Sequence, residues 1–105
     1  MNRMGALETV RDAITAAHSA APAPEFAVDP AGALRYFAEQ QALRLAADCV
    51  EEWGPLYTDR GSVEAQFAAR AIAEFVHHQI VTMLQEVGSP TLGPAWAYYE
   101  QGAQA

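Results

Sequence analysis

The sequence contains no lysine, a single cysteine and no long apolar stretch free of charge, proline or histidine. Because Cys49 stands alone, an intrachain disulfide and a zinc site built from several cysteines are excluded, and the composition is typical of a reducing compartment. Arg3 and Glu8 interrupt the start of the chain before an apolar core can form, so we expect neither a signal peptide nor a membrane-spanning segment. These absences predict a cytoplasmic protein.

Positive charge is also scarce. Six basic residues, all of them arginine, stand against 13 acidic residues, which gives a formal net charge of −7. The acidic residues are scattered along the chain, so the sequence offers no basic surface for the phosphates of a nucleic acid. The absence of lysine and the abundance of alanine are typical of a GC-rich bacterial genome.

Apolar side chains are plentiful. Hydrophobic residues make up 51% of the 105 positions, which suits one small globular domain over residues 1–105. Proline and glycine divide the chain into four segments, and none of these alternates between apolar and polar residues as a half-buried strand does. The sequence therefore predicts an all-α fold.

Helix boundaries follow from end signals. Asp29 and Ser62 suit N-caps, Pro30 suits a first helical position, and Gly88 suits a left-handed C-terminal cap. The predicted helices span residues 2–20, 30–53, 62–87 and 94–100, and residues 101–105 are expected to fray. The two long central helices should form an antiparallel hairpin, flanked by the short N-terminal and C-terminal helices.

A hairpin of two helices makes a thin core for a chain with many large aromatic rings. Dimerisation about a two-fold axis buries the same patch twice, so we expect it to complete a four-helix bundle. Aromatic residues dominate the energetics of such interfaces. The candidate contact residues are Val63, Phe67 and Val81, which interrupt the polar half of helix 62–87, together with Trp96 and Tyr99.

Glu39 falls near the middle of the apolar half of predicted helix 30–53. A buried carboxylate without a partner is costly, and Arg35, one turn earlier, is the expected partner. The alternative is that Glu39 serves as a ligand or as a functional buried acid. Cys49 lies on the same apolar half with no basic neighbour at helical spacing, which favours a packed thiol over a nucleophile.

Glu74 and His77 form a Glu-x-x-His sequence, which places a carboxylate and an imidazole on one face of a helix. This spacing resembles one half of the metal site in ferritin-like di-iron proteins, where two such motifs and two further carboxylates meet inside a four-helix bundle. The resemblance implies a site across a dimer that holds iron, manganese or zinc, with Glu39 of each chain as the further carboxylate. The opposing interpretation places Glu74, His77 and His78 on a solvated polar face.

No pattern in the sequence indicates catalysis. The chain has no glycine-rich phosphate loop, no Gly-x-Ser-x-Gly motif and no convincing pair of nucleophile and base. We therefore expect a small acidic helical module that binds another protein or a second copy of itself, with no catalytic residues and no cofactor. The alternatives are a ferritin-like metal-carboxylate protein and a small acidic inhibitor of a basic partner.

Overall fold

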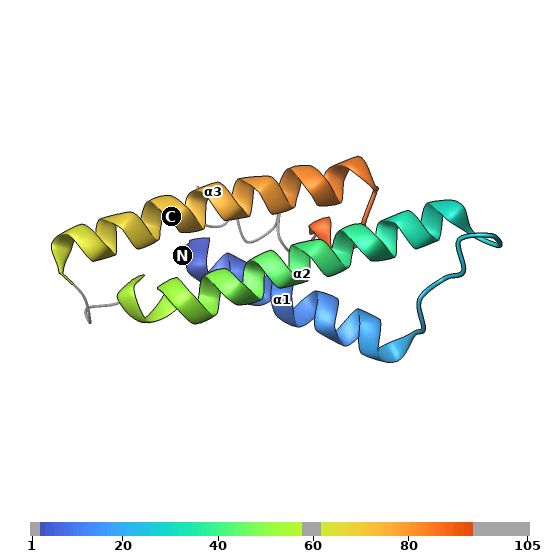
Figure 1. Cartoon of the computed structure of the whole chain (residues 1–105), viewed down its shortest axis with the longest axis horizontal. Helices are drawn as coiled ribbons and strands as arrows, with labels where there is room; N and C mark the ends of the chain where they lie inside the picture. Colours follow the sequence, from blue (N-terminus) through green and yellow to red (C-terminus); the bar gives the residue numbers. More distant parts are fainter. Residues whose placement is uncertain (1–2, 58–61, 94–105) are drawn as a thin grey trace.

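The computed structural model describes residues 3–57 and 62–93. Within these ranges the chain forms three helices, α1 (Arg3–Ala20), α2 (Pro30–Tyr57) and α3 (Val63–Glu86), and no strand. The predicted all-α class is thereby confirmed. Figure 1 shows α2 and α3 side by side and running in opposite directions, with α1 packed against both. The predicted helix 94–100 and the tail 101–105 lie outside the described residues.

The helix ends use the side chains that mark them in the sequence. Asp29 Oδ1 accepts a hydrogen bond from the backbone N–H of Gly32 at 3.0 Å, and α2 begins at the intervening Pro30. Ser62 Oγ accepts from the N–H of Ala65 at 3.1 Å, which satisfies one of the unpaired donors at the start of α3. These two N-terminal predictions are confirmed.

The end of α3 is a left-handed cap. Gly88 has φ of 63°, a conformation that L-residues with a side chain rarely adopt. Its N–H donates to the carbonyl of Gln85, and the N–H of Ser89 donates to the carbonyl of Leu84 at 3.0 Å. This pair of hydrogen bonds is the Schellman pattern, and it turns residues 88–93 back towards the start of α2.

Helix α2 extends one turn beyond its predicted end. It continues past Trp53 through Gly54 and Pro55 to Tyr57. A proline at this position removes one backbone hydrogen bond, and its ring crowds the carbonyl four residues earlier. Trp53 and Tyr57 both pack against the core, so burial of their rings favours the longer helix.

The core belongs to three helices rather than to a hairpin alone. The largest fully buried side chains are Leu7, Val10, Ile14, Ile80 and Leu84, of which the first three come from α1. Helix α2 contributes mainly small groups to this core, including Ala42 and Ala46. Because small side chains allow helices to approach closely, α1 can insert its large residues against α2 and α3.

None of the described helices is long and apolar enough to cross a membrane.

Candidate functional site

Glu39 is buried at a junction of three segments, α1, α2 and the residues that follow α3. One carboxylate oxygen lies 3.1 Å from Nε2 of His18 near the end of α1. The other oxygen accepts a hydrogen bond from Ser89 Oγ. The hydroxyl of Ser89 also accepts from the N–H of Thr91 at 3.2 Å. The carboxylate therefore has two partners, from segments 21 and 50 residues away in the sequence.

His18 is held in a fixed orientation by its neighbours. Its ring stacks on that of Tyr36, with centroids 3.9 Å apart and an interplanar angle of 9°. The side-chain amide of Gln40 lies beside Nδ1. An amide N–H that donates to Nδ1 leaves the imidazole proton on Nε2, where it is donated to Glu39. Two neighbours from α2 thus align His18 with the carboxylate.

The expectation that Arg35 pairs with Glu39 is wrong. Arg35 Nε instead donates to the backbone carbonyl of Val87 at 3.3 Å. That carbonyl lies at the C-terminus of α3, where the helix dipole favours a positive charge. The pattern of α2 alone points to Arg35, because only the tertiary structure brings His18 and Ser89 to the carboxylate.

The arrangement of His18, Glu39 and Ser89 holds segments together rather than activating a nucleophile. Nucleophilic catalysis needs the hydroxyl to donate to the imidazole, which would take its proton. Here the hydroxyl and the imidazole both donate to the carboxylate that lies between them. The cluster therefore links the end of α1, the first half of α2 and the segment after α3.

Glu74 and His77 occupy different environments on α3. Glu74 is exposed and forms an ion pair with Arg3, whose Nε lies 3.3 Å from the carboxylate. His77 is buried, although the sequence pattern places it on the polar face. The reason is that α1 covers this side of α3, which no pattern within α3 can reveal.

The three residues of the di-iron-like interpretation do not meet within one chain. Glu74 contacts Arg3 at the start of α1, whereas Glu39 contacts His18 near its end. These two positions of α1 are about 22 Å apart at the standard helical rise. Across the described parts of the chain, no group of three or more His, Cys, Asp or Glu side chains is placed to hold a metal ion.

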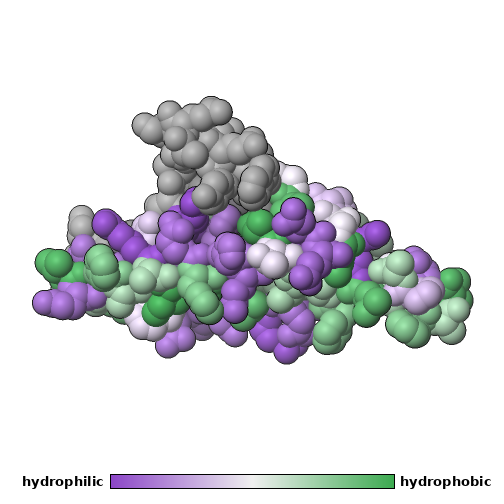
Figure 2. Space-filling view, turned by 90° about the horizontal axis from the view of Figure 1, so that it is seen from above, coloured by the Kyte–Doolittle hydropathy of each residue, from purple (hydrophilic) through white to green (hydrophobic). Residues whose placement is uncertain are grey.

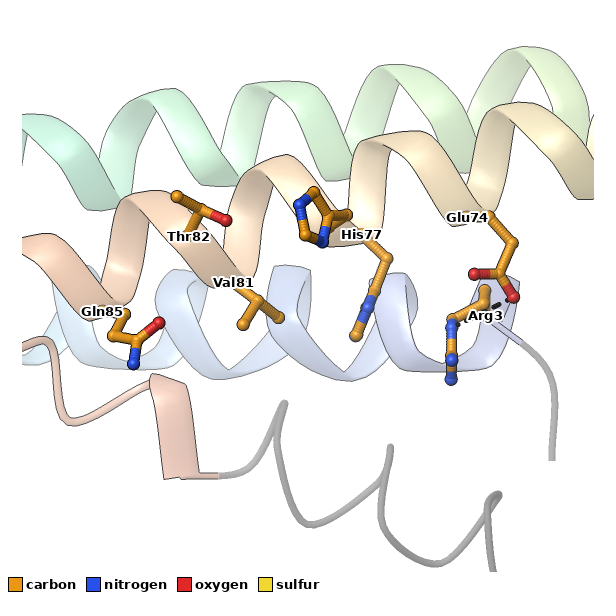
Figure 3. A pocket seen from close by; sticks show the side chains of 7 residues that line it. Arg3, Glu74, His77, Val81, Thr82 and Gln85 are labelled. Carbon is orange, nitrogen blue, oxygen red and sulfur yellow. Dashed lines mark ion pairs between the residues drawn. The ribbon is translucent and has the colours of Figure 1, made fainter.

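A surface cavity of about 350 Å³ lies where α1 meets α3. Figure 3 shows Arg3 of α1 facing Glu74 of α3, with His77 and Val81 further along the same helix. Burial lowers the pKa of His77, the positive charge of Arg3 lowers it further, Glu74 opposes the shift, and His78 adds a smaller decrease. His77 therefore favours the neutral form in the folded protein.

We expect His77 to make the fold less stable in mild acid. As the pH falls below the ordinary histidine pKa of 6.5, the unfolded chain binds a proton that the folded chain resists, so the free energy of unfolding decreases. The slope is at most about 1.4 kcal/mol per pH unit. Urea titrations between about pH 7.5 and about pH 5 measure it.

The matched variants are His77→Leu and His78→Leu. His78 is exposed on the same helix and is the smallest of the causes that shift the pKa of His77, so its replacement should keep most of the wild-type dependence on pH, whereas His77→Leu should flatten it. Equal slopes in the wild type and His77→Leu would show that the buried imidazole does not contribute.

The outward face of α3 carries a row of apolar side chains at intervals of four residues, Val63, Phe67, Ala71 and Phe75, which we call the α3 ridge. Val63, Phe67 and Phe75 are 78%, 74% and 64% exposed, and Ala71 is exposed as well. Figure 2 shows the α3 side of the molecule, where apolar patches alternate with hydrophilic ones. Exposed apolar groups in such a row are candidates for contact with another protein.

Val81 differs from the expectation that it shares this surface with Val63 and Phe67. Its exposed fraction is 9%, and it belongs to the core cluster. Helix α1 begins level with Glu74, so it covers the C-terminal half of α3 and leaves the N-terminal half open. Trp96 and Tyr99, the other expected contact residues, lie outside the described residues.

Several exposed apolar residues of the structure were not predicted from the sequence. Phe75 continues the four-residue spacing from Phe67, a signal that the sequence does contain. A second exposed group lies where the α1 to α2 connection meets the start of α2, and it consists of Phe26, Val28, Leu34 and Phe37.

Cys49 is buried, as expected from its place on the apolar half of α2. Its burial raises the pKa of the thiol, and the negative charge of Glu52 raises it further.

Comparisons of the chain with protein-family models, with curated proteins and with solved structures found no match.

Proposed function

We propose that this protein is a small acidic helical module for protein–protein interaction, with the α3 ridge as its contact surface and without catalytic activity. The observation that carries the proposal is the exposure of Val63, Phe67 and Phe75 on one face of a helix whose other side forms the core. Large aromatic side chains supply most of the binding energy in protein interfaces. Self-association, predicted from the sequence as a dimeric four-helix bundle, is one form of this function.

The other interpretations have less support. The buried carboxylate of Glu39 is already engaged by His18 and Ser89, and Glu74 is engaged by Arg3. The net charge of −7 permits binding to a basic partner but does not specify a surface for it. The α3 ridge, in contrast, is a defined set of residues with a physical reason to leave water.

Site-specific photo-crosslinking in cells tests the proposal. A photoreactive phenylalanine analogue in place of Phe67 should form covalent adducts with another polypeptide chain. The control places the same analogue at Glu52, an exposed position on the outward face of α2, where we expect few adducts. Equal yields from the two positions would contradict the assignment of the α3 ridge as the contact surface.

A further inference from the structure

The inner part of the α3 ridge is symmetrical about Ala71. Phe67 lies four residues before this alanine, and Phe75 lies four residues after it. Rows of residues spaced by four form the ridges of a helix, and two such ridges pack against each other at a crossing angle of about −50°. The small side chain of Ala71 permits close approach at the crossing point, with a phenylalanine on either side.

We infer that a second copy of this chain covers the α3 ridge, so that two α3 helices cross at Ala71 on a two-fold axis. This inference rests on the proposed function and specifies the partner. A pattern of large, small and large side chains is its own complement, because the rotated copy places each Phe67 and Phe75 beside the space that the small Ala71 leaves.

The available area fits a stable dimer. Val63, Phe67 and Phe75 together expose roughly 400 Å² of apolar surface, if a fully exposed phenylalanine contributes about 200 Å². A standard interface buries about 800 Å² on each partner, of which about 57% is apolar, or about 450 Å². The α3 ridge therefore supplies nearly all the apolar area that such an interface uses.

Polar residues border the ridge and can form the rim of the interface. Arg70, Glu74 and His78 form the adjacent row of α3 and are exposed. Each copy carries a formal charge of −7, so the two copies repel each other at low ionic strength. Added salt should therefore strengthen self-association, whereas it would weaken binding to a basic partner.

An engineered disulfide tests the position of the axis. Only residues near a two-fold axis meet their own copies, and helices packed 8–10 Å apart bring the two Cα atoms of residue 71 to within about 3.4–5.4 Å. A disulfide spans Cα separations of about 4.4–6.8 Å. Under mild oxidation, Ala71→Cys should therefore form covalent dimers, while buried Cys49 stays reduced because its raised pKa disfavours the thiolate.

The matched control is Val63→Cys, also exposed and on the same ridge. Residue 63 lies about 12 Å along the helix from the crossing, so its two copies are at least about 10 Å apart, beyond disulfide reach. We expect covalent dimers from Ala71→Cys and few from Val63→Cys. Equal yields from both variants, or none from either, would overturn the inference.

Solution measurements test the surface without a disulfide. Light scattering and sedimentation equilibrium should show a wild-type dimer whose dissociation constant falls as salt is added. Phe67→Gln should raise that constant at least about 30-fold, because symmetry removes the ring twice. Phe37→Gln, an exposed phenylalanine on α2, should change it less than about threefold. Both positions are exposed, so both variants should fold, and circular dichroism checks this for each of them.

The outcomes separate this inference from the proposed function. The inference that a second copy covers the α3 ridge is contradicted if the wild-type protein is monomeric at high micromolar concentration. It is also contradicted if self-association weakens as salt is added. If Phe67 then crosslinks to a different protein, the inference fails and the proposed function stands. If the position crosslinks to no chain, both fail.

Discussion

Leu7→Ala is expected to lower the free energy of unfolding by about 3 kcal/mol or more. Leu7 is fully buried against the core, and truncation of a buried leucine removes its transfer free energy and leaves a cavity, at a cost of about 2–5 kcal/mol. That is a large share of the roughly 5–15 kcal/mol that stabilises a typical small domain. Chemical denaturation followed by circular dichroism measures the shift.

The matched control is Leu34→Ala, the same truncation at an exposed position of α2. It should change the free energy of unfolding by less than about 0.5 kcal/mol. The comparison tests whether α1 is part of the core, because a protein stabilised by α2 and α3 alone would tolerate Leu7→Ala. Equal effects of the two substitutions would show that α1 contributes little.

Glu39→Ala is expected to cost about 3 kcal/mol. The substitution leaves the Nε2 proton of His18 and the hydroxyl of Ser89 buried without their acceptor, and each unsatisfied group costs about 1–3 kcal/mol. Glu39→Gln keeps one acceptor oxygen, and its amide N–H can donate to the hydroxyl of Ser89 in place of the lost acceptor, so it should retain the fold at a smaller cost of about 1–2 kcal/mol. Thermal and chemical denaturation measure both.

The control for Glu39→Ala is Glu52→Ala, which removes an exposed carboxylate from the same helix. Its effect should stay within about 0.5 kcal/mol. If Glu39→Ala were no more costly than Glu52→Ala, the link between α1, α2 and the segment after α3 would not contribute to stability.

Glu39→Gln also tests the metal interpretation. A ferritin-like site across a dimer would lose bound iron, manganese or zinc in Glu39→Gln and in His77→Ala, while its helical content stayed intact. We expect the wild type to contain no stoichiometric metal and to gain no thermal stability when iron or zinc is added. Elemental analysis of the purified protein measures the first, and thermal denaturation measures the second.

Local features were sufficient to predict the three helices of the described residues. Proline, glycine and the caps Asp29 and Ser62 act through hydrogen bonds within a few residues, so their effect can be read from the sequence. The burial of Glu39 and Cys49 also follows from periodicity, because both lie on the apolar half of α2. The extension of α2 to Tyr57 was not predicted, because the burial of Trp53 and Tyr57 outweighs the tendency of Pro55 to end a helix.

The sequence by itself determined that the chain is helical, where its long helices begin and that Glu39 needs a partner. Only the tertiary structure decided which partner it has, because His18 and Ser89 are brought to the carboxylate by contacts between distant segments. The same reason separates Val63 from Val81, which share an angular position on α3 but differ in exposure. Helix α1 packs beside Val81 and not beside Val63. A periodic pattern within one helix carries no information about where another helix lies.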